Sequence, residues 1–152
     1  MLKSIEGNFD NPEVNELLTK HFVELRAASP EGSAHVLDIP GLKVPSIKFW
    51  SLWDNEKLIG CGALKFLDKE HGEFKSIRLA KKYRKKGNGI RLIKKLIEEA
   101  KKLGVKKISL ETGAGKFFKP ARKLFESYGF KKCKPFAHYK EDDNSVYMSL
   151  VI

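Results

Sequence analysis

The sequence Arg84-Lys85-Lys86-Gly87-Asn88-Gly89 joins an expected strand to an expected helix. The strand is predicted over residues 73–79, and the helix over residues 88–103, where apolar residues recur at helical spacing. A glycine-containing turn at a helix start exposes backbone N–H groups that have no partner within the helix. These donors and the positive end of the helix dipole attract phosphate. The stretch therefore predicts a site for a phosphorylated ligand.

Further elements are expected on both sides of this turn. A helix begins at Asn11-Pro12, where asparagine caps the first N–H groups and proline suits the first helical turn. A loop with at most a short helix follows over residues 29–46. Strands are expected over residues 2–5, 47–53, 57–66, 105–111, 130–136 and 145–151, and a last helix over residues 118–128. This order predicts one α/β or α+β domain over residues 1–152, with a mixed sheet.

Length and composition indicate an ordinary globular domain. The 152 residues fit one domain with a single core. Hydrophobic residues make up 41% of the chain, and no apolar run approaches the roughly 20 residues that span a bilayer. The first residues lack the long apolar segment of a signal peptide. We therefore expect a cytoplasmic protein without a membrane partner.

Cysteine and histidine positions give no sign of a disulfide or a metal site. Cys61 and Cys133 lie far apart in apolar surroundings, as isolated thiols do. The four histidines form no pair at the spacing of metal ligands. No metal is predicted.

The net charge of +11 arises from 30 basic and 19 acidic residues, and it can attract polyanions. Many of the basic residues surround the 84–89 stretch, where they form either a solvated surface or a basic rim around a phosphate site. A basic nucleic-acid-binding module is therefore one alternative, although the chain has no recognised nucleic-acid motif or arginine-rich helix. A nucleic-acid partner is not the expected one.

Two nucleotide-binding motifs are each matched only in part, because residues that they require are replaced. Leu92 takes the place of the third glycine of a dinucleotide fingerprint that would start at Gly87. A P-loop over residues 110–117 would need glycine at Leu110 and serine or threonine at Phe117. Both motifs are therefore rejected.

The chain resembles the GNAT superfamily of acyl-CoA-dependent N-acetyltransferases. Arg84, Gly87 and Gly89 match its Arg/Gln-x-x-Gly-x-Gly/Ala signature, and the segments 77–79 and 121–130 match the flanking patterns. Further segments resemble one subfamily of small bacterial single-domain members. The resemblance implies a mixed, mostly antiparallel sheet of about six or seven strands, flanked by about four helices. It also implies that the fourth and fifth strands splay apart, and that the thioester lies in the gap.

The resemblance implies acetyl-CoA as the co-substrate. Its pyrophosphate would lie on backbone N–H groups from about Lys85 to Ile90, and its pantetheine arm would pair with the backbone of Ile77 and Leu79. Phe118 replaces an asparagine that often contacts pantetheine, and it can pack against the arm but not hydrogen-bond it. The implied cofactor-binding residues are Ile77, Arg78, Leu79, Arg84, Lys85, Lys86, Gly87, Asn88, Gly89, Ile90, Phe118 and Phe125.

Catalysis requires an uncharged amine, and the resemblance implies two carboxylates as candidate bases. Glu73 aligns with a catalytic glutamate of some members, and the alternative is a solvent-facing strand residue. Glu111 is a second candidate base, or a grip on a cationic substrate. Phe125 replaces a tyrosine that often protonates the leaving thiolate. Tyr128 is then the candidate acid, with core packing as the alternative, and Tyr139 or water could substitute.

The predicted function is transfer of an acetyl group from acetyl-CoA to a primary amine of a small molecule, by direct attack in a ternary complex. The alternatives are acetylation of a protein amine, a catalytically inactive acyl-CoA sensor, and the nucleic-acid-binding module. A homodimer is possible. The acceptor pocket could be lined by aromatic residues that could equally belong to the core: His35, Trp50, Trp53, His138 and Tyr139.

Overall fold

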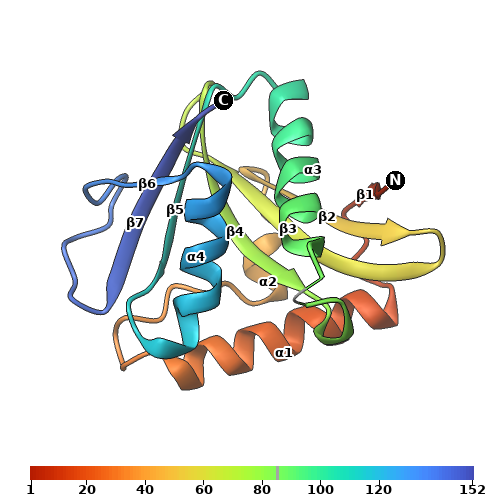
Figure 1. Ribbon diagram of the computed structural model, residues 1–152, viewed down its shortest axis with the longest axis horizontal. Helices are drawn as coiled ribbons and strands as arrows, with labels where there is room; N and C mark the ends of the chain where they lie inside the picture. Colours follow the sequence, from red (N-terminus) through yellow and green to blue (C-terminus); the bar gives the residue numbers. More distant parts are fainter. Residues whose placement is uncertain (85) are drawn as a thin grey trace.

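The computed structural model describes residues 1–84 and 86–152, and its helices and strands follow the expected order (Figure 1). The strands are β1 (Lys3–Glu6), β2 (Ile47–Asp54), β3 (Lys57–Phe66), β4 (His71–Leu79), β5 (Lys107–Gly113), β6 (Lys131–Lys132) and β7 (Ser145–Val151). The α-helices are α1 (Pro12–Ala28), α2 (Ile39–Leu42), α3 (Asn88–Lys102) and α4 (Lys119–Tyr128). Short 3₁₀ turns at Lys81–Tyr83 and Lys116–Phe118 precede α3 and α4.

The seven strands form one sheet in the order β1-β2-β3-β4-β5-β7-β6. Every neighbouring pair is antiparallel except β4 and β5, which α3 connects as a crossover. The helices α3 and α4 pack on one face, and α1 and α2 pack on the other. The expected mixed and mostly antiparallel sheet with four helices is therefore confirmed.

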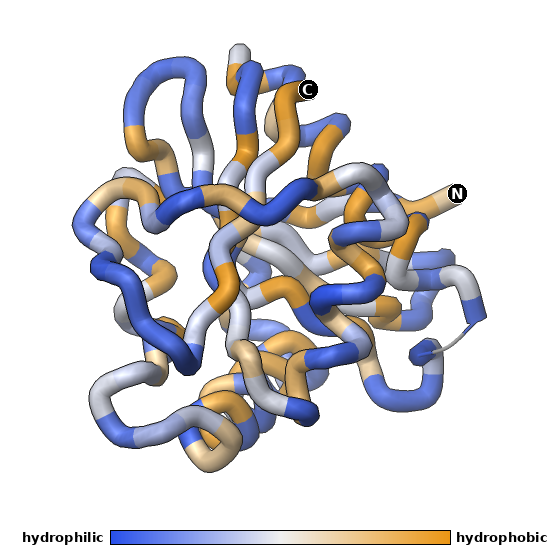
Figure 2. The backbone as a smooth tube through the Cα atoms, turned by 60° about the vertical axis from the view of Figure 1, so that its left-hand side comes forward, coloured by the Kyte–Doolittle hydropathy of each residue, from blue (hydrophilic) through white to orange (hydrophobic). Residues whose placement is uncertain are grey.

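Each face of the sheet buries its own apolar core. Phe74 of β4, Leu110 of β5 and Leu96 of α3 belong to the larger core, beneath α3 and α4. Val14 of α1 and Phe49 of β2 belong to the smaller core, beneath α1 and α2. The turns and loops at the edge of the molecule are mostly hydrophilic (Figure 2). Within the described residues, no helix has the length and apolarity needed to cross a membrane.

The strands β4 and β5 separate along their length, as expected. Their pairing ends at Phe74 and Leu110, although β4 continues to Leu79 and β5 to Gly113. On its other edge β4 carries a bulge against β3, where the register shifts opposite Cys61–Ala63. Ser76 in this bulge has a left-handed backbone with φ 52°. A bulge bends its strand, so it helps β4 to diverge from β5.

Two elements near the end of the chain differ from expectation. The strand expected over residues 130–136 shrinks to Lys131–Lys132, because Pro135 has no N–H for a ladder. The segment after Cys133 instead crosses one face of the sheet as an irregular connection. The strand expected over residues 105–111 begins two residues later, because the Val105 N–H bonds to the Ala100 carbonyl at the end of α3.

The close approach of β4 to Gly60 of β3 can be tested by substitution. A Cβ atom at Gly60 would overlap the Arg78 carbonyl, whereas one at Gly115 would meet no atom within 4 Å. We expect Gly60→Ala to lower the free energy of unfolding by about 1–3 kcal/mol, since backbone cannot move aside cheaply. Gly115→Ala, the matched control, should change it by less than about 0.5 kcal/mol. Urea titration measures both, and equal values for the two variants would contradict the close approach.

Candidate active site

The start of α3 exposes backbone donors as predicted from the sequence. Gly87 is the N-cap residue, and its φ of 74° is a left-handed conformation that glycine adopts without strain. It has no side chain to cap the helix, so the first N–H groups of α3 remain available to an anion. Lys86 and Ile90 flank this turn on the surface. Lys85 lies outside the described residues, so its predicted contact stays a prediction.

Asn88 and Gly89 shape this turn from within. The Asn88 amide donates to the Tyr83 carbonyl at 2.9 Å, and its oxygen accepts from Arg91 Nη1 at 2.8 Å. Its side chain therefore holds the preceding loop against the helix. A Cβ at Gly89 would press into Leu124 of α4, so glycine lets the two helices approach.

The diverging part of β4 leaves one edge of its backbone without a β5 partner after Phe74. Ile77 and Leu79 pack toward the core beneath α3 and α4. Arg78 points to the opposite face, where Nη2 binds Glu24 of α1 at 2.8 Å. The side chain of Arg78 thus fastens α1 over the strand, and only its backbone lies along the free edge.

Phe118 and Phe125 occupy different surroundings. Phe125 is buried in the core beneath α3 and α4, with its ring edge-on to Phe130 at 5.6 Å. Phe118 is buried beside the end of β5, where a Cβ at Gly113 would overlap its ring. Phe118 also lines a small pocket of about 60 Å³ that contains Glu111. Phe118 therefore forms part of the wall of this small pocket at the end of β5.

Glu73 lies on the α1 face of the sheet and is almost fully buried, with 1% of its side chain exposed. The Tyr139 hydroxyl donates to its Oε2 at 2.6 Å, and Lys75 Nζ lies 3.2 Å from the same oxygen. Lys75 Nζ also donates to the Tyr139 oxygen at 3.1 Å. The other carboxylate oxygen, Oε1, is buried without a partner among the described residues. The reading of Glu73 as a solvent-facing residue is therefore wrong.

Burial and neighbouring charges alter two acids of this site. Burial, with the Glu73 carboxylate alongside, raises the pKa of Tyr139 far above its ordinary value, so its hydroxyl remains protonated and donates. Burial also raises the pKa of Glu111, against a hydrogen bond of 2.8 Å from Ser145 Oγ. Glu111 lies two residues beyond Ser109, the β5 partner of Glu73, so its side chain is on the same face of the sheet as Glu73.

A larger pocket of about 740 Å³ opens over Tyr139. It lies between the loop after α1 and the irregular connection before β7, which Ser33 Oγ joins by donating to Asp142 Oδ2 at 2.7 Å. Among the aromatic candidates, Trp50 and Trp53 are buried in the cores instead. The lining residues are Gly32, His35, His138, Tyr139, Lys140, Glu141, Asp142, Asp143 and Asn144.

The two candidate tyrosines lie in different places. Tyr128 is half-buried against the core beneath α3 and α4, whereas Tyr139 is hydrogen-bonded to Glu73. The sequence predicts Tyr139 only as a substitute acid and as a residue of the acceptor pocket. Its contact with Glu73 spans 66 residues of chain, so no local pattern could pair the two.

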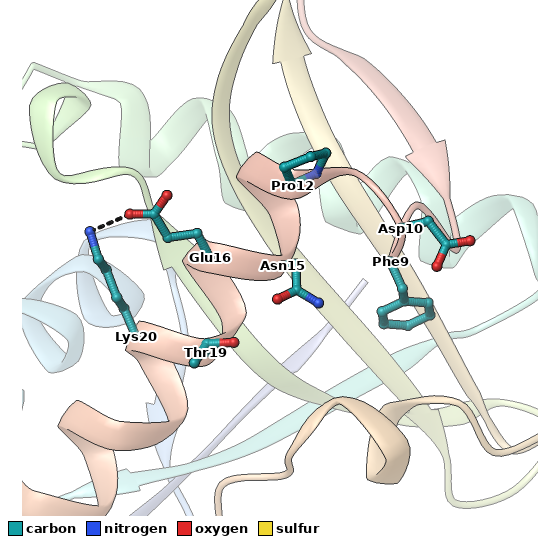
Figure 3. Close-up of a pocket in the computed structure, with 7 residues that line it drawn as sticks. All are labelled: Phe9, Asp10, Pro12, Asn15, Glu16, Thr19 and Lys20. Atoms are coloured by element: carbon teal, nitrogen blue, oxygen red, sulfur yellow. Dashed lines mark ion pairs between the residues drawn. The ribbon is translucent and has the colours of Figure 1, made fainter.

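A third depression, of about 630 Å³, lies along the first half of α1 (Figure 3). Its polar side chains include Glu16 and Lys20, an exposed ion pair at 2.8 Å. None of the residues predicted for catalysis or cofactor binding lines it. The candidate active site is therefore the gap between β4 and β5 together with the pockets over Tyr139 and Glu111.

Comparison with known proteins identifies the family of the chain. The model of the acetyltransferase (GNAT) family matches residues 12–130, from the first turn of α1 to the residue before β6. The chain belongs to this GNAT family of acetyltransferases. This GNAT protein is accordingly an enzyme, an acyl-CoA N-acyltransferase.

Two bacterial relatives match nearly the whole GNAT protein. The uncharacterized N-acetyltransferase YsnE of Bacillus subtilis is 47% identical over 137 residues, covering 90% of this chain and 91% of that protein. The uncharacterized N-acetyltransferase YedL of Escherichia coli is 37% identical over 142 residues, covering 93% and 89%. A GNAT acetyltransferase of Elizabethkingia anophelis, solved with acetyl-CoA bound, shares the fold with a TM-score of 0.69 and 21% identity, covering 99% and 98%.

The role of the left-handed glycine at the start of α3 can be tested against a second left-handed glycine, just beyond the other end of the helix. Gly87 has φ 74° and Gly104, just after α3, has φ 86°, and a Cβ would meet no atom at either. Alanine at either position should cost about 1 kcal/mol of stability. Only Gly87→Ala should weaken acetyl-CoA binding, by about fivefold to tenfold, because the strain of ~1 kcal/mol distorts the anion-binding turn. Calorimetric titration measures this, and an equal loss in Gly104→Ala would show a general effect of instability.

Proposed function

We propose that this GNAT protein transfers an acetyl group from acetyl-CoA to a primary amine of a small molecule, by direct attack in a ternary complex. The observation that carries the proposal is the group formed by the buried Glu73 and the half-buried Tyr139 and Lys75, beside the gap between β4 and β5. A carboxylate with one unpartnered buried oxygen is costly to maintain unless it serves a ligand. The group lies beneath a pocket that opens to solvent, where an acceptor can reach it.

The residues of the donor side fit acetyl-CoA. The uncapped start of α3 offers N–H groups to the pyrophosphate, and the glycine at position 87 leaves room for its approach. The free edge of β4 from Ile77 to Leu79 offers backbone groups to the peptide-like pantetheine arm. Arg84 and Lys86 supply positive charge beside the phosphates. The side chains of Asn88, Arg78 and Phe125 act indirectly, by holding the turn, α1 and the core.

Glu73 is the proposed general base. An amine with a pKa well above neutrality must lose a proton before it attacks the thioester. The unpartnered Oε1 of Glu73 can accept that proton, directly or through water, while Oε2 stays bound to Tyr139. Glu111 is the second carboxylate of the proposed site; burial raises its pKa, and a cationic amine bound beside it would favour its charged form.

Tyr139, rather than Tyr128, is the proposed donor of a proton to the leaving thiolate. The Glu73 charge contributes to the raised pKa of Tyr139, so the hydroxyl is a poor acid while Glu73 is ionised. Once Glu73 has taken the amine proton, this contribution disappears and Tyr139 releases its proton more readily. The resulting phenolate regains a proton from Glu73 across their 2.6 Å hydrogen bond. The amine proton thereby reaches the thiol, and both residues return to their starting states.

The pocket favours a small acceptor over a protein. Its volume of about 740 Å³ lies within the range of about 300–1,000 Å³ of small-molecule sites. Its walls are two loops joined by the Ser33–Asp142 hydrogen bond, which narrows access for a folded partner. A sensor without catalysis would have no use for a buried base, and the catalytic alternative is therefore preferred.

The base assignment predicts a pH-dependent defect. We expect Glu73→Gln to lower kcat/KM for a primary amine by about 10²–10⁴-fold at neutral pH, because the amide cannot accept the proton. The defect should shrink as pH rises toward the pKa of the amine, since the uncharged amine then needs no base. Thiol release from acetyl-CoA measures turnover, and calorimetry should show unchanged acetyl-CoA affinity.

Glu111→Gln is the matched control for this variant. It removes a second carboxylate of the same site, and we expect it to raise KM for the amine more than it lowers kcat. Unchanged turnover of Glu73→Gln at both neutral and high pH would rule out Glu73 as the base. Full activity of Tyr139→Phe would likewise rule out the proposed proton path.

A further inference from the structure

The pocket over Tyr139 is acidic, although the chain carries a net charge of +11. The run Glu141-Asp142-Asp143, three consecutive acidic residues found nowhere else in the sequence, lines this pocket. Lys140 is the lysine among the lining residues, and His35 and His138 line the pocket as well. With neutral histidines the opening therefore carries a formal charge of −2, from three acids and one lysine.

A second negative region lies deeper in the site. Glu73 and Glu111 outnumber Lys75 by one charge; Lys75 pairs with Glu73, and Glu111 lies on the same face of the neighbouring strand. The two regions are adjacent, because His35 lines both the large pocket and the small pocket that contains Glu111. Tyr139 connects them as well, since it lines the large pocket and donates to Glu73. Glu73 keeps a buried, unpartnered oxygen beside this connection, which points to a ligand that supplies a donor.

The acids at the opening have different roles. Asp142 is held by Ser33 Oγ at 2.7 Å and by the Asn144 N–H at 2.8 Å, and these bonds lower its pKa. Its carboxylate therefore fixes the loop. Glu141 and Asp143 are exposed, and neither forms an ion pair within residues 1–84 and 86–152. Both charges are therefore available to a cationic ligand.

We infer that the acceptor is a diamine or a longer polyamine. One amine reacts beside Glu73 and Glu111, and a second ammonium group lies against Glu141 and Asp143. The transfer forms one amide, releases CoA as its thiol, and leaves the second ammonium unchanged. This assignment rests on the proposed acetyltransferase function and adds the class of acceptor to it. Negative charge at both depths favours such a molecule over a monoamine of equal length and disfavours acidic amines.

Matched amines test the assignment directly. Putrescine and n-butylamine have the same carbon chain and differ in the second ammonium group, as do cadaverine and n-pentylamine. We expect kcat/KM of the unaltered protein to be at least about tenfold higher for each diamine, as two exposed charge contacts allow. The preference should decline as sodium chloride is raised, because salt screens exposed charges.

A double variant assigns the preference to the opening. Glu141→Gln with Asp143→Asn removes both charges and leaves Asp142 in its loop. It should lower kcat/KM for putrescine by about tenfold and change that for n-butylamine by less than about twofold. The control, Asp10→Asn with Glu56→Gln, removes two exposed charges at the other end of the molecule and should preserve the preference. Thermal unfolding of both double variants checks that each is folded.

The outcomes separate this inference from the proposed function. Equal turnover of diamines and monoamines, or an unchanged preference in the double variant, would overturn the inference and leave the acetyltransferase proposal standing. Calorimetric titration of putrescine into the CoA-loaded protein reads the site without turnover. Tighter binding of putrescine than n-butylamine, lost in the double variant, would support the site even if neither amine were acetylated. Equal binding of the two amines would overturn this inference, and the absence of thiol release with every primary amine tested would overturn the proposed function.

Discussion

The pairing of β4 with β5 ends at Phe74 and Leu110, and the candidate active site depends on that end. The two strands are held together up to this point by the core beneath α3 and α4, where both side chains are buried. Beyond it the bulge at Ser76 bends β4 away, and the backbone edge toward β5 is left free. A sheet that stayed paired would offer neither an edge for a donor nor a gap for a thioester.

In the proposed arrangement, the two substrates approach the diverging strands from different sides. Side chains alternate along β4, so Phe74 supports the core while Glu73 and Lys75 face the other way, toward the loops after α1 and before β7. The start of α3 gathers basic residues around exposed N–H groups, and the opening over Tyr139 gathers acidic ones. A basic protein can therefore attract a polyanionic donor and a cationic acceptor at once, because the opposite charges are concentrated at separate entrances.

The features that the sequence predicted well are those that depend on neighbouring residues. Asn11-Pro12, the glycine-containing turn at Gly87 and the apolar spacing of α3 are local signals, and the structure follows each of them. The strand expected over residues 130–136 is reduced to Lys131–Lys132, because Pro135 has no N–H for the ladder. The burial of Glu73 could not be predicted, since a glutamate in a strand is usually exposed and its partner is 66 residues away.

In the proposed mechanism, Tyr139 takes the role of the tyrosine that Phe125 replaces. Phe125 is buried in the core beneath α3 and α4 beside Phe130, where a hydroxyl would need a partner of its own. In that mechanism, the Tyr139 hydroxyl is hydrogen-bonded to Glu73 at 2.6 Å, so its acidity depends on whether Glu73 is protonated. An independent acid on α4 would lack this coupling. Proton uptake from the amine then favours proton release toward the thiolate. The proposed acid thus lies on the opposite face of the sheet from Phe125, next to the proposed base Glu73.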